Sequence, residues 1–160
     1  MNSALICIPD QQMIIVDEQQ QPLFQCRVNT AQNGVGCLRD SGCTPFGKHY
    51  VRACIGEGLS AYAVLRGRRV TEEEWTPALM NAQPERDWIL GRILWLCGSE
   101  PGINRGGSLD TFRRYIYIHG SPQWPDDAKP SSHGCVRVAP EDMLRVFDLL
   151  LYGSSVSIES

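Results

Sequence analysis

The sequence predicts a mainly β domain with about two helices, and three observations support that prediction. The first half holds short runs of apolar or alternating residues separated by turn-forming residues, which indicate strands. A stretch near the C-terminus has its apolar residues at helical spacing. Strands precede helices instead of alternating with them, so the order does not favour a doubly wound parallel sheet. Because 160 residues suit one ordinary domain, we expect a single domain over residues 1–160.

Three or four strands are predicted in the first half, two or three of them in a meander. The runs ALICI (4–8), QMIIV (12–16) and PLFQCRV (22–28) are divided by PDQ and DEQQQ, a pattern that predicts a meander of antiparallel strands. A loop rich in glycine and proline follows, and HYVRACI (49–55) then alternates as another strand. Residues 57–83 lack a clear period. We expect them to leave the sheet as an excursion and to be a candidate lid.

Two helices and two strands are predicted in the second half. PERDWILGRILWLCG (84–98) begins with proline and acidic residues and ends on glycine, which predicts a buried helix. RRYIYIHG (113–120) favours a buried strand that ends near His119. APEDMLRVFDLLLYG (139–153) has proline at the first helical position and apolar residues at i, i+3, i+4, i+7 and i+8, which predicts an amphipathic helix. SVSIE (155–159) predicts a closing strand.

Charge and composition exclude several partners. The formal net charge is −3 and the basic residues are scattered in ones and twos, so no basic patch marks a site for nucleic acid or an anionic membrane. No run approaches the roughly 20 apolar residues of a membrane span. The first residues lack the cationic segment and long apolar core of a signal peptide. If the chain begins at its native methionine, these observations predict a cytoplasmic protein that binds neither nucleic acid nor membrane.

One of the cysteines stands in unusual surroundings. The chain has seven cysteines, an odd number without a C-x-x-C pair, which indicates neither a disulfide framework nor a zinc ribbon. Most cysteines in such a chain are small buried hydrophobic residues. Cys135 lies in SSHGCVRV (131–138), where hydroxyl, histidine, glycine and arginine residues form a mixture that a hydrophobic core rarely contains. Cys135 is therefore the candidate nucleophile.

Two histidines, His119 and His133, lie just upstream of Cys135. A cysteine nucleophile must lose its proton, and either histidine is a candidate base that would favour the thiolate and lower the pKa of the thiol. The same three side chains could instead hold a catalytic zinc ion with water as the fourth ligand. Against zinc, the metal would occupy the thiolate, and no glutamate lies beside a ligand to act as a base. We therefore expect neither a metal nor another cofactor.

The stretch around these residues resembles a known family signature. YIYIHG (115–120), a short spacer and SHGCVR (132–137) are similar to the signature of the YkuD-type L,D-transpeptidases, in which a histidine precedes [S/T]-H-G-C, a hydrophobic residue and Arg or Asn. TPFGKHYV (44–51) is similar to the family's T-P-x-G strand entry, and PERDWILGRILWL (84–96) with NRGG (104–107) looks like a bacterial branch. The resemblance implies the single-domain β-sandwich of the L,D-transpeptidase catalytic domain. The chain departs from the family in showing no secretion signal and no accessory domain.

The resemblance also implies the roles of the central residues. Cys135 would be the nucleophile, and His119 would be the base that takes its proton. The backbone carbonyl of Gly120 would orient the imidazole ring through its other nitrogen, so no side-chain carboxylate would be needed.

Residues next to the nucleophile would complete the site. His133 and Ser132 would shape it and support its hydrogen bonds, and the N–H groups of Gly134 and Cys135 would stabilise an oxyanion. Arg137 would either hold the structure together or bind a substrate carboxylate, and the sequence favours neither role.

The function implied by the resemblance is acyl transfer on peptidoglycan stem peptides. The family cleaves after the third residue, between the L-centre of a diamino acid and a terminal D-residue, and leaves a thioester on the enzyme. An amine then gives a cross-link, whereas water gives L,D-carboxypeptidase activity. The missing signal favours water, so we expect a cytoplasmic L,D-carboxypeptidase that removes terminal D-alanine from tetrapeptides or muropeptides in murein recycling.

Two alternatives stay open at this point. One is an L,D-transpeptidase that forms peptidoglycan cross-links, and the other is a non-catalytic module that binds peptidoglycan fragments and has an inert cysteine. Rapid alkylation of Cys135 by iodoacetamide at neutral pH, in preference to the other six cysteines, would separate an activated thiol from an inert one.

Overall fold

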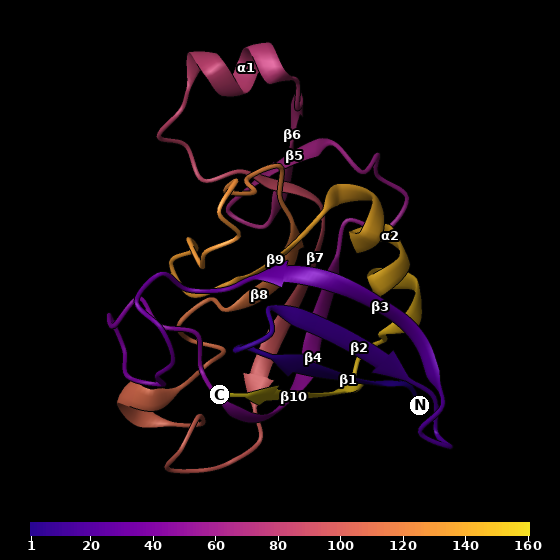
Figure 1. Cartoon of the computed structure of the whole chain (residues 1–160), viewed down its shortest axis with the longest axis vertical. Helices are drawn as coiled ribbons and strands as arrows, with labels where there is room; N and C mark the ends of the chain where they lie inside the picture. Colours follow the sequence, from indigo (N-terminus) through magenta and orange to yellow (C-terminus); the bar gives the residue numbers. More distant parts are fainter.

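Ten strands joined in one sheet form most of the molecule in the computed structural model, which describes all residues 1–160 (Figure 1). The strands are β1 Ser3–Cys7, β2 Gln12–Val16, β3 Pro22–Asn29, β4 Gly47–Ile55, β5 Ala63–Arg66, β6 Arg69–Glu74, β7 Ile89–Gly98, β8 Tyr117–Gly120, β9 Val136–Val138 and β10 Ser155–Glu159. Their order is β4-β10-β1-β2-β3-β9-β8-β7-β5-β6, and β4 also pairs with β7. That last pairing closes the first eight strands of the order into a ring, and β5 and β6 continue beyond it. The predicted mainly β fold is confirmed.

The N-terminal strands pair as their alternating pattern predicts. β1, β2 and β3 form an antiparallel meander, and the central residues of β1 and β2 alternate between buried and less buried positions. β10 lies parallel to β1, with Ala4 opposite Val156, and antiparallel to β4. The closing strand predicted at 155–159 is therefore confirmed, and it joins the two ends of the chain into the ring.

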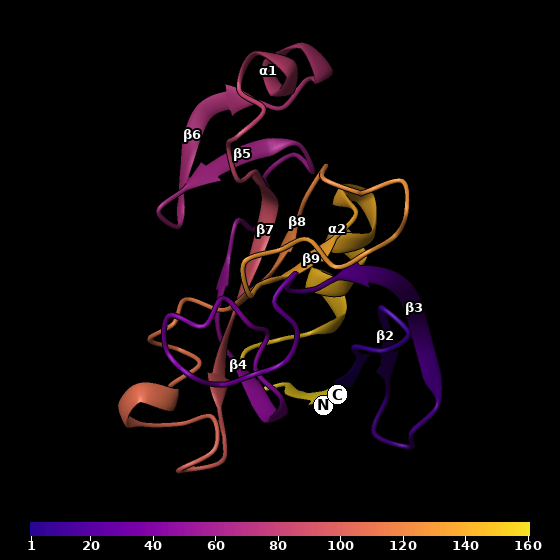
Figure 2. The ribbon, with the colours of Figure 1, turned by 60° about the vertical axis from the view of Figure 1, so that its left-hand side comes forward.

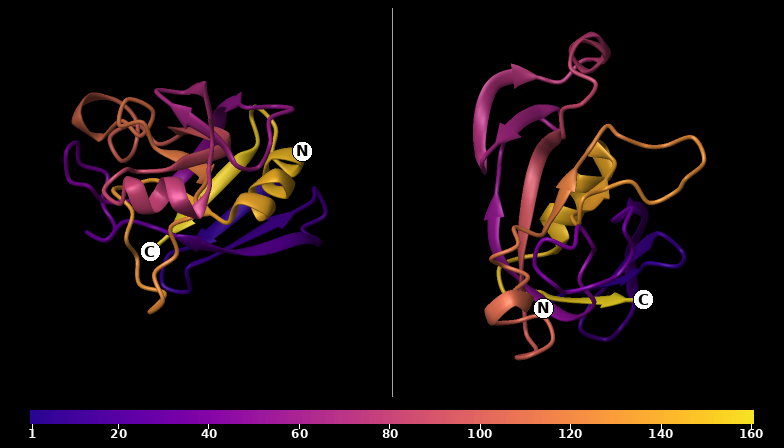
Figure 3. Two further views of the ribbon diagram at one scale, coloured as in Figure 1. Left: turned by 90° about the horizontal axis from the view of Figure 1, so that it is seen from above. Right: turned by 90° about the vertical axis from the view of Figure 1, so that its left-hand side faces the viewer.

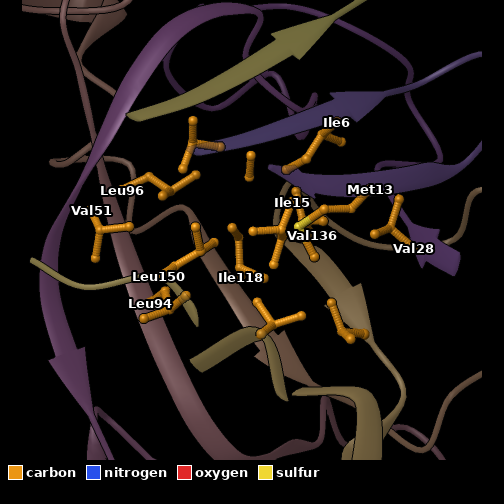
Figure 4. Close-up of a cluster of buried hydrophobic side chains, with 14 of the residues drawn as sticks. Ile6, Met13, Ile15, Val28, Val51, Leu94, Leu96, Ile118, Val136 and Leu150 are labelled. Carbon is orange, nitrogen blue, oxygen red and sulfur yellow. The ribbon is translucent and has the colours of Figure 1, made fainter. Parts of the chain in front are cut away.

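Buried apolar side chains from every strand of the ring meet in one core (Figure 4). This cluster has 18 buried residues, among them Ile6, Ile15, Leu94, Ile118 and Val136. The helix α2 (Pro140–Leu149) contributes its buried face to the cluster and packs against β7 and β8. Each such side chain contributes about 1.5–3 kcal/mol when it is buried. The helix predicted in residues 139–153 is thus confirmed, and it packs against β8, the strand that carries His119.

The helix predicted over residues 84–98 is wrong. Residues Ile89–Gly98 form β7, which pairs with β4, β5 and β8 and has nearly all of its residues buried. A strand covered on both faces is a continuous apolar run without alternation, and such a run does not distinguish a strand from a buried helix. The proline, acidic and glycine signals at its ends suit a helix equally well. Gly91, with φ of +71°, lies where the pairing with β8 shifts in register.

Residues 57–83 do not leave the sheet entirely. They form the β5–β6 hairpin, which pairs with β7, and then the short helix α1 (Pro77–Ala82), which the sequence did not predict. Figures 1 and 3 show this unit beyond the ring, at the N-terminal end of β7. Trp88 and Leu90 anchor it, with Tyr62, Trp75 and Met80 packed around them. The role of this segment as a lid stays a prediction.

Neither helix is both long and apolar enough to cross a lipid bilayer.

Candidate active site

The pairing of β8 with β9 places His119 and Cys135 on the same face of the sheet. These strands are parallel, with Ile118 opposite Val136 and His119 opposite Arg137. Ile118 and Val136 point into the core, so the alternating neighbours, His119 and Arg137, point to the other face. Cys135 directly precedes β9, two residues before Arg137, and therefore shares that face. Strand register thus places the two residues singled out from the sequence on one face of the sheet, at the adjacent strands β8 and β9.

His119 is held as a neutral imidazole with one free nitrogen. Its side chain is buried, with 1% of the residue exposed, and Nδ1 lies 2.8 Å from the carbonyl oxygen of Gly120. Since a carbonyl only accepts hydrogen bonds, Nδ1 carries the proton and Nε2 holds a lone pair. Nε2 is buried and has no hydrogen-bond partner. Burial lowers the pKa of His119 below its ordinary value, although the Gly120 carbonyl acts against this, so the ring is uncharged at neutral pH.

Gly120 also has a steric reason to be glycine. A Cβ atom at this position would lie 2.4 Å from the carbonyl oxygen of Leu90 on β7, which is far too close for a side chain. The close approach of β7 and β8 therefore depends on this glycine. The role of its carbonyl in orienting His119 stays a prediction, and the contact through which it would act is present.

The thiol of Cys135 is neutral at rest, which differs from the lowered pKa expected from the sequence. Burial raises its pKa to about 12, and the charge of Asp87 adds to the rise, whereas the N–H of Tyr117 and the charges of Arg137 and Arg114 act in the opposite direction. Sγ accepts a hydrogen bond from the N–H of Tyr117 at 3.3 Å and lies 3.4 Å from the carbonyl oxygen of Tyr115, to which the S–H can donate. A base must therefore remove the proton during attack. Rapid alkylation at neutral pH is no longer expected.

A hydrogen-bonded turn presents Cys135. Ser132, which is buried, donates to the carbonyl of Cys135 at 2.6 Å and accepts the N–H of Gly134 at 3.2 Å. Thr44, from the loop before β4, donates to the carbonyl of Gly134 at 2.9 Å. Gly134 has φ of +133°, and a Cβ there would lie 3.0 Å from Ile116. The turn is thus held from both sides.

Only one of the two N–H groups expected to face an oxyanion is free. The N–H of Gly134 is directed to Ser132, whereas the N–H of Cys135 makes no hydrogen bond within the chain. A carbonyl oxygen bound beside Sγ would find the Cys135 N–H available as a donor. The N–H of Gly134 could take part only if the hydrogen bond to Ser132 opened.

Replacing Ser132 by alanine tests the importance of this turn. We expect Ser132→Ala to lower the free energy of unfolding by about 1–3 kcal/mol, because two hydrogen bonds are lost and the N–H of Gly134 is left buried. Urea unfolding followed by fluorescence measures the change. Ser155→Ala is a suitable comparison, since Ser155 on β10 is exposed and its hydroxyl makes no hydrogen bond within the chain. An unchanged stability in Ser132→Ala would contradict the role assigned to this hydroxyl.

His133 lies apart from the buried pair. It is exposed, forms no hydrogen bond, and borders two separate hollows, one on each side of the site. No cluster of three or more histidine, cysteine, aspartate or glutamate side chains in the chain is arranged to hold a metal ion. His119, His133 and Cys135 therefore do not form the three-ligand zinc site considered from the sequence.

Arg137 is tied into the structure by a residue that the sequence did not single out. It is buried, with 4% exposed, and donates from Nη2 to Asp87 at 3.1 Å and from Nη1 to Ser131 at 3.0 Å. The sequence left two roles open for Arg137, to hold the structure together or to bind a substrate carboxylate, and these contacts serve the first role. Asp87 lies 50 residues away in sequence, within the segment predicted as helical. Asp87 and Arg137 come together because β7 pairs with β8 and β8 pairs with β9, which carries Arg137.

A family model matches nearly the whole chain. The YkuD family model, described as the L,D-transpeptidase catalytic domain, matches residues 2–158. No curated protein sequence matches the chain.

The fold is similar to solved L,D-transpeptidases. Alignment with the enzyme from Xylanimonas cellulosilytica covers 99% of this chain and 60% of that one, with 16% identity and a TM-score of 0.57. A cysteine-to-serine mutant from Enterococcus faecium gives a TM-score of 0.60 at 16% identity, over 99% of this chain and 49% of that one. The enzyme from Mycobacterium smegmatis gives 0.54 at 15% identity, over 99% and 58%. The chain thus spans about half to three fifths of these structures, and at this identity the likeness concerns the fold.

Proposed function

The chain belongs to the YkuD family of L,D-transpeptidase catalytic domains, and on that premise we propose that it cleaves peptidoglycan stem peptides through a thioester on Cys135. The observation that carries this proposal is the buried lone pair on Nε2 of His119, on the same sheet face as the Cys135 thiol. A neutral base beside a neutral thiol suits proton removal during attack. The scissile bond joins the L-centre of the diamino acid to a terminal D-residue.

The proposed reaction has two steps that use the same base. In the first, Nε2 of His119 takes the S–H proton while Sγ attacks the carbonyl carbon, and the N–H of Cys135 stabilises the oxyanion. The C–N bond then breaks, and His119 returns the proton to the leaving amine. In the second, His119 takes a proton from water, the resulting hydroxide equivalent attacks the thioester, and the proton passes to the departing sulfur. The products are a tripeptide and free D-alanine, with the enzyme unchanged.

Within this proposal, water is the acceptor and the enzyme is an L,D-carboxypeptidase. Support comes from the chemistry of the two acceptors: water needs only His119 for activation, whereas cross-linking needs a second stem peptide bound beside the thioester. The proposed substrates are tetrapeptides or muropeptides released in murein recycling, and the proposed location is the cytoplasm. Cell fractionation with an antibody to the chain tests the location.

A product assay decides between hydrolysis and cross-linking. We expect the purified chain to convert a stem tetrapeptide ending in D-alanine into tripeptide and D-alanine at equal rates with and without an added acceptor stem. Chromatography with mass detection follows both products. Dimers as the main product would make the chain a cross-linking enzyme. Retained peptide binding without any product would instead favour the non-catalytic binding module.

A further inference from the structure

A hollow lined by three arginines borders the turn that presents the nucleophile. It has a volume of about 400 Å³, and its walls include Arg39, Arg113, Arg114 and Tyr115. The loops 30–46 and 99–116 build it, and Figure 2 shows them side by side, as does the hydrogen bond from the N–H of Arg39 to the carbonyl of Ser108 at 2.7 Å. A second hollow of about 400 Å³ shares the same four residues. We call the two together the arginine hollow.

The arginine hollow reaches Cys135 through Tyr115. The carbonyl oxygen of Tyr115 is 3.4 Å from Sγ of Cys135, and the rest of Tyr115 lines the hollow. The charge of Arg114 is close enough to act on the Cys135 thiol, where it opposes the rise in pKa that burial causes. His133 also borders the hollow, from the turn that presents the nucleophile. A group bound among the arginines would therefore lie next to the reacting atoms.

The positive charge of the arginine hollow is poorly neutralised by the chain itself. Arg113 forms no ion pair and no side-chain hydrogen bond, and Arg39 meets only the exposed Asp40, at 4.0 Å. Arg114 donates to backbone carbonyls, including that of Cys43 at 2.6 Å, and has no carboxylate partner. Asp110 also lines the hollow, but it accepts the N–H groups of Gly106 and Arg113. The guanidinium group of Arg113 thus has no carboxylate partner, and that of Arg39 has only the exposed Asp40, which also lines the hollow.

The opposite side of His133 has a different character. The hollow there is bordered by Met80, Pro84, Trp124 and Pro125 and by the charged Glu85 and Arg137, and it lies between α1 and the loop after β8. These side chains suit the longer acyl part of a stem peptide better than a single charged group. Arg137 in this wall is already paired with Asp87 at 3.1 Å, whereas Arg113 has no carboxylate partner, so the arginine hollow is the better site for a substrate carboxylate.

We propose that the arginine hollow binds the terminal α-carboxylate of the residue that leaves, with Arg113 and Arg39 as its ligands and Arg114 as a fixed wall. This inference rests on the proposed function. The scissile nitrogen and the α-carboxylate of a terminal residue are both attached to the same α-carbon, so the carboxylate must lie within a few ångströms of Cys135. Guanidinium groups bind carboxylates through paired, charge-assisted hydrogen bonds. The hollow thus restricts cleavage to the last residue of a chain.

The test compares a stem tetrapeptide that ends in D-alanine with the same peptide ending in D-alanine carboxamide. We expect the wild-type chain to cleave the acid at least about tenfold more efficiently in kcat/KM, because only the acid offers a carboxylate to the guanidinium groups. In the double variant Arg39→Ala with Arg113→Ala, the preference should fall to about one through loss of acid cleavage, with amide cleavage unchanged. Arg145→Ala, an exposed arginine of α2 outside the hollow, should keep the full preference.

A binding measurement separates failure of this inference from failure of the proposed function. Calorimetry with the Cys135→Ala variant should show tighter binding of the acid than of the amide, and the added Arg113→Ala and Arg39→Ala changes should remove that difference. Equal binding of both peptides would overturn the arginine hollow as a carboxylate site, whether or not the wild-type chain cleaves them. Equal cleavage of acid and amide by the wild type would overturn it while leaving the proposed reaction in place. Absence of cleavage with tighter acid binding would overturn only the reaction.

Discussion

Replacing Cys135 by alanine is expected to abolish release of D-alanine from a stem tetrapeptide, with a loss in kcat of roughly 10⁴-fold or more. The reason is that no other side chain on the same sheet face can form the acyl intermediate. His119 would still be able to activate water, but the two-step route through a thioester would be lost. Product formation measured by chromatography over long incubations gives the size of the effect.

The control for this variant is a second cysteine. Cys54 on β4 is exposed and lies outside the site, so Cys54→Ala should keep wild-type activity. Urea unfolding should show that both variants are folded. If Cys135→Ala released D-alanine at the wild-type rate, the covalent mechanism would be wrong, and a direct attack by water would have to be considered.

Replacing His119 by glutamine is expected to lower kcat/KM by about 10²–10⁴-fold, the usual effect of removing a general base. The rate alone would not separate a base from a structural residue, so the pH profile is the decisive measurement. Burial lowers the pKa of His119 from its ordinary value of 6.5, so the wild-type chain should keep its base form, and hence its activity, to a pH below 6.5. In His119→Gln the acid limb due to this group should disappear.

Stability has to be followed together with the pH profile. His49 is buried as well, and its pKa is lowered to about 4, so it is neutral in the folded chain at pH 6 and partly charged in the unfolded chain. Its contribution to stability is complete above pH 6.5 and is lost as the pH falls toward 4. Activities should therefore be read only where circular dichroism shows a folded chain. If the acid limb persisted in folded His119→Gln, another group would be the base.

The sequence predicts the strands well where one face is exposed and poorly where both are covered. The meander of β1 to β3 was visible because its residues alternate, and α2 because its apolar residues recur at helical spacing. β7 resembles a helix in the sequence because both of its faces are buried, so its residues do not alternate, and because its paired strands, β4 and β8, come from distant parts of the chain. Strand pairing over such distances leaves no local signal.

The same distinction holds for the candidate site. Cys135 and His119 were found because a short, chemically mixed stretch carries them. Asp87 and Arg113 were not, since their relation to Cys135 arises only when separate loops and strands meet. The direction of the Cys135 pKa also depends on tertiary burial, which reverses the expectation drawn from neighbouring histidines alone. Chemistry encoded in one segment is predictable, whereas its electrostatic environment belongs to the fold.

The neutral thiol of Cys135 also bears on how the protein tolerates oxidants. Hydrogen peroxide attacks thiolates, and sulfenic acid forms fastest at accessible cysteines with a low pKa. A cysteine whose pKa is raised to about 12 is almost entirely protonated at neutral pH, so we expect it to resist peroxide until a substrate arrives. Its reactivity would then be reserved for electrophiles placed within reach of His119, and redox stress would leave the chain competent for turnover.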